Sequence, residues 1–259
     1  MSYIYGLNPV LEALRARRRR ISQILLAQGS RPARLEELLA AAQRANIPIK
    51  QEKRAYLERL AGGANHQGVI AFVQPAEYVD IEDILTDINP DSLLVLLDNI
   101  EDPHNLGAII RSAECAGAQA IIIPEHHSVG ITEVVVKASA GAVEYLPVAR
   151  VTNLTQTIDA LKAKGVWVVA IEAGSATDYT KWDYKGATAL VFGSEGKGLR
   201  RLVKEHCDTS VAIPLLGRVS SLNVSVAAGI VLYEALRQRK AAATSSTLLG
   251  KAKDASIPE

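Results

Sequence analysis

The sequence predicts an α/β protein made of two units, and three observations carry this prediction. From Ser92 onward, short apolar runs of strand length alternate with longer amphipathic segments, which is typical of a parallel sheet covered by helices. Residues 1–75 show the same alternation on a smaller scale. An acidic segment at 76–91 separates the two stretches, so we expect one domain on each side of a linker.

The N-terminal unit, residues 1–75, alternates between short helices and strands. Asn8 followed by Pro9 predicts a helix start with Asn8 as the cap. Gly62-Gly63 breaks the chain before the last strand. Two further helices are predicted at 35–45 and 55–60, and strands at 21–26, 47–49 and 68–73.

The C-terminal unit, residues 92–240, has the pattern of an open α/β sheet, in which ligands bind at the carboxyl ends of the strands. Strands are predicted at 93–97, 120–123, 166–171, 189–192 and 211–213, and helices at 106–116, 154–164, 199–206 and 222–239. A short helix at 81–88 is expected within the linker. The tail at 241–259, rich in Ala, Ser, Thr and Lys, is expected to be disordered.

Composition excludes several classes of protein. Apolar runs are no longer than a strand, so neither a membrane span nor a signal peptide is predicted. The two cysteines, Cys115 and Cys207, have no cysteine or histidine at metal-ligand spacing, so we expect no metal site. A reduced, cytoplasmic protein is the simplest interpretation.

Charge is divided unequally along the chain. Residues 1–75 hold 12 Lys and Arg against 5 Asp and Glu, a net charge of +7, whereas the remainder carries −6. Four consecutive arginines, Arg17–Arg20, supply much of the excess. One basic run is commonly a solvated helix end, but an excess spread over a whole unit favours an anionic partner such as nucleic acid.

The first candidate site segment follows the strand at 93–97 and leads into the helix that contains Arg111. Asn105 stands at the expected helix start, where it serves either as a cap or as a site residue. An arginine on a helix leans toward the N-terminus, so Arg111 can reach this loop. The alternative is an ion pair of Arg111 with Asp98 or Glu114, and the sequence alone favours neither.

The second candidate segment is the glycine-rich loop at 191–199, which contains Gly193, Glu195 and Gly196. Glycines let the backbone turn sharply and approach a ligand closely. The loop lacks the Lys-Ser/Thr pair of a Walker A loop and the third glycine of a dinucleotide fingerprint. The negative charge of Glu195 also disfavours a phosphate ligand.

The third candidate segment, residues 213–229, follows the last predicted strand. Ser221 is a possible cap of the final helix, and Asn223 is a site candidate at the start of that helix. Ser225 and Gly229 are better explained by tight helix packing. No Gly-x-Ser-x-Gly elbow surrounds Ser221, so serine hydrolase chemistry is disfavoured.

Together the three segments resemble the motifs of the SpoU/TrmH family, S-adenosylmethionine-dependent RNA ribose 2'-O-methyltransferases of the SPOUT superfamily. The match covers residues 92–240 in order and spacing. It rests on Asn105 with Arg111, on Phe192-Gly193-Ser194-Glu195-Gly196, and on Ile213-Pro214 followed by Ser221-Leu222-Asn223-Val224-Ser225-Val226-Ala227. The N-terminal unit resembles the family's substrate-binding domain, which is similar to ribosomal protein L30e, at residues 5–14 and at His66-Gln67-Gly68.

The resemblance implies a trefoil knot in the C-terminal domain, a homodimer, and S-adenosylmethionine as cofactor. It places the cofactor against Gly193, Ile213 and Leu222, with Gly196, Pro214 and Leu215 close by. It also implies that Arg111 acts on the ribose 2'-hydroxyl. The same resemblance assigns the orientation of substrate and cofactor to Asn105, Glu195, Ser221 and Asn223.

The predicted partner is RNA, bound by the basic N-terminal unit with Arg17–Arg20 and His66 as candidate contacts, and a place in the core is an equally open interpretation of His66. The two-domain form is more similar to bacterial 23S ribosomal RNA guanosine 2'-O-methyltransferases than to the tRNA branch. The alternatives are a tRNA ribose 2'-O-methyltransferase, a non-catalytic RNA-binding protein with the same fold, and a nucleotide-hydrolysing enzyme. The failed Walker A match weakens the last of these.

Overall fold

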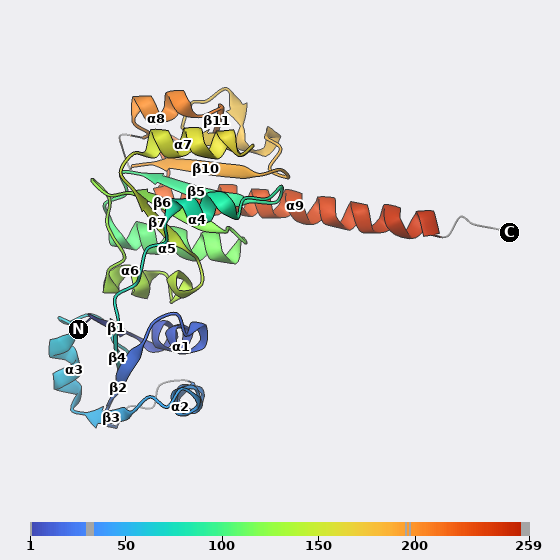
Figure 1. Ribbon diagram of the computed structural model, residues 1–259. Helices are drawn as coiled ribbons and strands as arrows, with labels where there is room; N and C mark the ends of the chain where they lie inside the picture. The colour runs from blue at the N-terminus through green and yellow to red at the C-terminus, as the bar shows by residue number, and fades with distance from the viewer. Residues whose placement is uncertain (1, 30–33, 195, 197, 255–259) are drawn as a thin grey trace.

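The computed structural model describes residues 2–29, 34–194, 196 and 198–254, and it contains two sheets flanked by helices (Figure 1). The smaller, N-terminal sheet has the strand order β1-β4-β2-β3. Strands β1 and β2 pair antiparallel with β4, whereas β3 pairs parallel with β2. Its elements are β1 (Ser2–Tyr5), α1 (Leu7–Ala16), β2 (Ile21–Ala27), α2 (Leu35–Arg44), β3 (Ile49–Glu52), α3 (Arg54–Leu60) and β4 (Val69–Val73).

The larger sheet has the strand order β7-β6-β5-β10-β8-β11-β9, and every neighbouring pair in it is parallel. Its strands are β5 (Leu93–Asp98), β6 (Ala120–Pro124), β7 (Val148–Val151), β8 (Trp167–Ile171), β9 (Thr177–Asp178), β10 (Thr188–Gly193) and β11 (Thr209–Ala212). Its helices are α4 (Ile81–Thr86), α5 (Pro103–Cys115), α6 (Glu133–Ala138), α7 (Leu154–Ala163), α8 (Arg201–His206) and α9 (Val224–Asp254).

Helices cover both faces of the larger sheet, which explains why its central strands are apolar at every position. On β5, Leu93, Val95 and Leu97 belong to the cluster that includes residues of α5, α6 and α9. Leu94 and Leu96 belong to a second cluster with residues of α4, α7 and α8. Successive side chains of a strand point to opposite faces, so the two clusters are the two faces of one sheet.

Predicted strands and helices of the sheet match the structure closely, and the departures are short elements. Four elements were not predicted from the sequence, namely β1, β7, β9 and α6. None of them exceeds six residues, and the two residues of β9 are too few to show an alternation of apolar and polar positions. The strand predicted at 47–49 lies further on, at Ile49–Glu52. The predicted cap Asn8 is wrong, since α1 already begins at Leu7 and its cap is Gly6, with φ of 95°.

The predicted disordered tail is also wrong for its first part, because α9 continues through Asp254. Alanine has the highest helix propensity, and three consecutive alanines, residues 241–243, follow Lys240 without a proline or turn. In Figure 1 this red helix leaves the larger sheet and projects away from the rest of the molecule.

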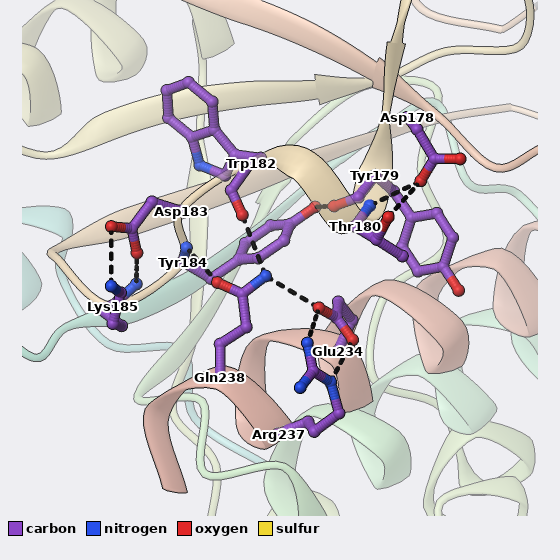
Figure 2. A network of polar contacts seen from close by, with 10 residues as sticks. All are labelled: Asp178, Tyr179, Thr180, Trp182, Asp183, Tyr184, Lys185, Glu234, Arg237 and Gln238. Atoms are coloured by element: carbon purple, nitrogen blue, oxygen red, sulfur yellow. Dashed lines mark hydrogen bonds and ion pairs between the residues drawn. The ribbon is translucent and has the colours of Figure 1, made fainter. Parts of the chain in front are cut away.

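The middle of α9 is attached to the segment that contains β9 and residues 179–185 (Figure 2). Gln238 donates to the carbonyl oxygen of Trp182 (3.0 Å) and accepts from the backbone N–H of Tyr184 (3.2 Å). Arg239 donates to the carbonyl oxygens of Tyr184, Gly186, Asp91 and Ser92. These carbonyls lie just before β5 and β10, so the helix is fixed to the chain at the amino ends of two neighbouring strands.

The predicted linker is only partly a free connection. Val79 pairs with the strand β7 through a bridge to Ala149 and a hydrogen bond from its N–H to the carbonyl of Val148 (3.0 Å). Ile84 and Leu85 of α4 are buried against the α7 face of the larger sheet. The second half of the acidic segment is therefore packed as part of the C-terminal domain.

The N-terminal sheet is joined to the larger domain through polar contacts, one of which is buried. The Arg19 guanidinium binds both carboxylate oxygens of Glu144, with Nε to Oε2 at 3.0 Å, and both side chains are almost fully buried. The hydroxyl of Tyr145 donates to Glu12 (2.7 Å). Arg19, a candidate RNA contact, therefore connects the two domains, so for this residue the RNA-contact prediction is wrong. The net charge of a segment cannot show that one arginine of the run forms an ion pair with a buried Glu144.

Candidate active site

The three predicted loops meet at one edge of the larger sheet. Strand β10 lies between β5 and β8, and β11 follows β8. All of these strands are parallel, so the loops that leave their carboxyl ends lie side by side. The segment after β11 runs back across this edge to α9, which packs against α5. The edge therefore collects residues from four distant parts of the chain.

A cavity of about 300 Å³ lies over the ends of β10, β8 and β11. Five of the predicted cofactor contacts line it, together with the predicted orienting residue Ser221. These five are Gly193, Gly196, Ile213, Leu215 and Leu222. The sixth, Pro214, is exposed and is not among the lining residues.

The glycine-rich loop closes tightly on itself beside this cavity. Ser194 and Gly198 exchange two backbone hydrogen bonds, of 3.1 and 2.9 Å. A Cβ on Gly193 would lie 2.2 Å from the carbonyl carbon of Gly198, so only glycine fits there. Gly196 has φ of 78°, in the left-handed region that glycine tolerates. These glycines therefore let the backbone itself form a wall of the cavity.

A second cavity, of about 290 Å³, adjoins the first on the β5 side. Ser194 and Val224 line both cavities. The rest of its lining is mostly polar: Asn99, Ile100, Glu101, Asp102 and Asn105. The Asn99 side-chain oxygen is buried and has no hydrogen-bond partner within the described part of the chain. Polar groups thus face this cavity, whereas glycine backbone and apolar groups dominate the first.

Asn105 and Asn223 join the helices at the boundary of the two cavities. The Asn223 Nδ2 donates to the Asn105 Oδ1 at 2.9 Å. The Asn223 Oδ1 accepts from the N–H groups of Ser225 (2.9 Å) and Val226 (3.3 Å), so Asn223 is the cap of α9 and Ser221 is not. Asn105 is not a cap either, because Asp102 caps α5 by accepting from the N–H of His104 (2.9 Å).

Arg111 lies on the exposed side of α5 and is not among the residues that line either cavity. Within the described part of the chain its guanidinium has no hydrogen bond or ion pair. The ion pair with Asp98 considered from the sequence is excluded, because Asp98 is fully buried and bound by Arg200. Arg200 donates through its backbone N–H (2.8 Å) and its Nε (2.7 Å).

This Asp98–Arg200 contact is a feature that the sequence analysis did not find. It connects the end of β5 with the exit of the glycine-rich loop, across 102 positions of sequence. A buried Asp at a strand end was the available signal, but its partner cannot be read from spacing. Glu195, the remaining predicted site residue, lies outside the described residues.

His66, a candidate RNA contact, is a core residue. Its side chain is 2% exposed, and its Nδ1 accepts from the N–H of Gly68 at 3.0 Å. Burial lowers the pKa of its imidazole, which favours the neutral form. Of the two interpretations of His66, RNA contact is therefore wrong and the core position is confirmed. Arg17, Arg18 and Arg20 are exposed and remain candidates.

Among the described residues, no group of three or more His, Cys, Asp or Glu side chains is arranged to hold a metal ion. None of the helices in the described part of the chain is long and apolar enough to cross a membrane.

Two family models match this chain. Residues 92–233 match the SpoU rRNA Methylase family, and residues 3–79 match the model for RNA 2'-O ribose methyltransferase substrate binding. The chain belongs to the SpoU methylase family. The two models cover the two sheets, with the substrate-binding match on the smaller sheet and the SpoU methylase match on the larger one.

Related proteins match along nearly the whole chain. It is 41% identical to the putative TrmH family tRNA/rRNA methyltransferase YacO of Bacillus subtilis and 42% identical to the 23S rRNA (guanosine-2'-O-)-methyltransferase RlmB of Pseudomonas putida. Each match covers 92% of this chain and 96% of the relative. The SpoU methyltransferase AviRb of Streptomyces viridochromogenes, crystallised with the cofactor AdoMet, superposes with a TM-score of 0.77 at 27% identity. This match covers 92% of this chain and 90% of AviRb.

These findings confirm the predicted fold, in which a SPOUT methylase domain follows a substrate-binding domain along the chain. This SpoU methylase is an S-adenosylmethionine-dependent RNA 2'-O-methyltransferase. The larger cavity fits that cofactor, since it has the size of a small-molecule site and glycine backbone that can approach an adenosine closely.

Proposed function

We propose that this enzyme methylates the ribose 2'-hydroxyl of a guanosine in 23S ribosomal RNA. The observation that carries the proposal is the pair of adjoining cavities that meet at Ser194 and Val224. One is shaped for an adenosine-containing cofactor and the other is lined with polar groups for an acceptor. The name of the Pseudomonas relative, at 42% identity over nearly the whole chain, supports the ribosomal substrate.

We assign cofactor binding to Gly193, Gly196, Ile213, Pro214, Leu215 and Leu222, chiefly through their backbone groups. When bound, S-adenosylmethionine supplies a methyl group that is already activated by the sulfonium. The protein must then hold the acceptor hydroxyl in line with that methyl group and assist loss of its proton. The rigid boundary formed by Asn105 and Asn223 supports such alignment, and we assign orientation to them together with Ser221 and Glu195.

We assign the action on the 2'-hydroxyl to Arg111. A guanidinium keeps its proton at neutral pH, so Arg111 acts by stabilising the developing alkoxide rather than as a strong base. Its exposed guanidinium has no ion pair among the described residues, which leaves its charge available to the substrate and supports this role. The first turn of the same helix, α5, lines the acceptor cavity through Asn105.

Binding of the RNA backbone falls to the N-terminal domain. Its net charge of +7 supports salt-dependent binding of phosphates. Arg17, Arg18 and Arg20 are exposed, and we assign them to this contact. The buried Arg19–Glu144 pair joins this domain to the methylase domain.

We also infer a homodimer. Large apolar side chains are exposed beside the cofactor cavity and along α9, namely Leu216 (100%), Val219 (75%), Val226 (51%) and Tyr233 (52%). An exposed apolar surface of this kind is typical of an interface with another protein. A cytoplasmic location is supported by the two free thiols, Cys115 and Cys207.

The decisive experiment is to delete the gene and map 2'-O-methyl groups across ribosomal and transfer RNA. We expect one guanosine methylation in 23S RNA to disappear and to return when the gene is restored. Loss of a methyl group in tRNA alone would overturn the ribosomal assignment in favour of the tRNA alternative. A restored Arg111→Ala gene that still returns the methyl group would refute the role of Arg111.

Binding separates this proposal from the alternatives outside methyl transfer. S-adenosylhomocysteine should raise the melting temperature of the purified protein, because a ligand that binds the native state stabilises it. ATP at the same concentration should not. A rise with ATP alone would support nucleotide hydrolysis, and no rise with either ligand would support a non-catalytic RNA-binding protein.

A further inference from the structure

Glu172 is the one charged side chain among the described residues that line the cofactor cavity. It directly follows β8, and its backbone N–H donates to the carbonyl of Val211 on β11 (3.0 Å), which fixes its position at the sheet edge. Other lining groups are apolar, hydroxyl or glycine backbone. A carboxylate in such a lining requires a specific explanation.

The two oxygens of the Glu172 carboxylate have different surroundings. Oε1 lies 3.8 Å from the Nζ of Lys204, which is too long for a hydrogen bond but keeps a positive charge near. Oε2 is buried and has no hydrogen-bond partner within the described part of the chain. A Cβ on Gly198 would lie 3.4 Å from Oε1, so the carboxylate rests against the glycine-rich loop.

A buried carboxylate oxygen without a donor is costly, and a bound molecule that brings a donor into the cavity removes this cost. S-adenosylmethionine carries two kinds of donor that suit a carboxylate: the two ribose hydroxyls and the α-ammonium group. Lys204 already provides a positive charge beside Oε1. A neutral pair of adjacent hydroxyls therefore suits Glu172 better than a second cation.

The position of Glu172 in the sheet agrees with this choice. The transferred methyl group must face the acceptor cavity, which meets the cofactor cavity at Ser194, at the end of β10. Glu172 follows β8, on the side of β10 away from β5. The carboxylate thus lies away from the reacting centre, where it can hold the cofactor without touching the acceptor.

We propose that the Glu172 carboxylate binds the ribose hydroxyls of S-adenosylmethionine and is a specificity-determining residue for the cofactor. This inference rests on the assignment of the larger cavity to the cofactor. It adds a side-chain contact to a site whose other proposed contacts are mostly backbone groups. Binding of the ribose diol would also discriminate against deoxynucleosides of the same shape.

The test compares two probes that share adenine and ribose. S-adenosylhomocysteine carries the amino-acid tail, whereas 5'-methylthioadenosine lacks it. Glu172→Gln keeps the shape but accepts a weaker hydrogen bond, so calorimetry should show about tenfold weaker binding of both probes. Weakening of S-adenosylhomocysteine alone would overturn the ribose assignment, because it would place Glu172 at the α-ammonium group.

Two comparisons keep the test interpretable. Lys204→Met removes the nearest cation but leaves the carboxylate, and we expect binding of both probes within about twofold of the unmodified protein. The melting temperature without ligand should not fall in Glu172→Gln, which excludes a folding defect. If Glu172→Gln binds both probes as tightly as the unmodified protein does, this inference alone is wrong. If the unmodified protein does not bind S-adenosylhomocysteine, the assignment of the cavity to the cofactor is wrong.

Discussion

The two adjoining cavities are built by different means. The cofactor cavity takes its shape from backbone, because Gly193, Gly196 and Gly198 bring the chain close without side chains. The acceptor cavity takes its character from side chains, with amide and carboxylate groups of the loop after β5. Substitutions should therefore affect the two cavities in different ways. Loss of a side chain should impair chemistry on the acceptor side, whereas cofactor binding should respond most to added bulk.

The largest expected effect is at Arg111, on the helix whose first turn lines the acceptor cavity. Arg111→Ala should lower the rate of methyl transfer by about a hundredfold to a thousandfold, the usual cost of removing a group that stabilises developing charge. Cofactor affinity should stay within about twofold, because Arg111 does not line the cofactor cavity. Single-turnover transfer to RNA and calorimetry with S-adenosylhomocysteine measure the two quantities separately.

A control variant sharpens this prediction. Arg111→Lys keeps the positive charge but loses the planar fork of donors, so it should recover only part of the rate. If Arg111→Ala bound the cofactor much more weakly, the assignment of Arg111 to the acceptor and not to the cofactor would be wrong.

Added bulk on the cofactor side should have the next largest effect. In Gly193→Ala the new Cβ would lie 2.2 Å from the carbonyl carbon of Gly198 and 2.4 Å from the N of Leu199, so the loop must open. Overpacking of this kind costs about 1–3 kcal/mol when the closed loop is kept. If the loop opens in the free protein and must close to bind the cofactor, this cost weakens binding by roughly 5- to 150-fold. Gly217→Ala is the matched control, since no atom lies within 4 Å of its Cβ position. Equal binding by both variants would show that the tight loop is not needed.

The same contrast explains how much of the molecule the sequence could predict. The three loops could be located because each follows a strongly apolar strand, and parallel strands bring their carboxyl ends to one edge. Their roles depended on the family resemblance. The order of the strands could not be predicted, and so neither could contacts such as Asp98 with Arg200, which join the ends of non-consecutive elements.

The N-terminal domain shows the limit of charge as evidence. A net charge of +7 describes the domain as a whole, but it does not say which arginine is free. Arg19 is buried against Glu144, while Arg17 and Arg20 remain exposed. Burial depends on how the two domains pack, and no local pattern around these residues encodes that packing.

A smaller effect is expected at the boundary of the two cavities. Asn223→Ala removes both the cap of α9 and the contact with Asn105, so it should lower the free energy of unfolding by about 1 kcal/mol and slow methyl transfer. Asn105→Ala loses the same contact but keeps the cap, so it should slow transfer as well. The double variant should lose less than the sum of the two single losses, because the effects of residues in contact are not additive. Additive losses in transfer would show that the two asparagines act independently.

The smallest effect should come from removing a side chain on the cofactor side. Leu215 lines the cofactor cavity but is 36% exposed, so Leu215→Ala gives up little buried apolar area and should weaken cofactor binding by only about threefold. Leu202 is also exposed, at 55%, and does not line the cavity, which makes Leu202→Ala the control with no expected change. Calorimetry with S-adenosylhomocysteine resolves a threefold difference. A loss at Leu215 as large as that in Gly193→Ala would mean that side-chain contact, rather than the backbone wall, holds the cofactor, and the contrast between the two cavities would then fail on its cofactor side.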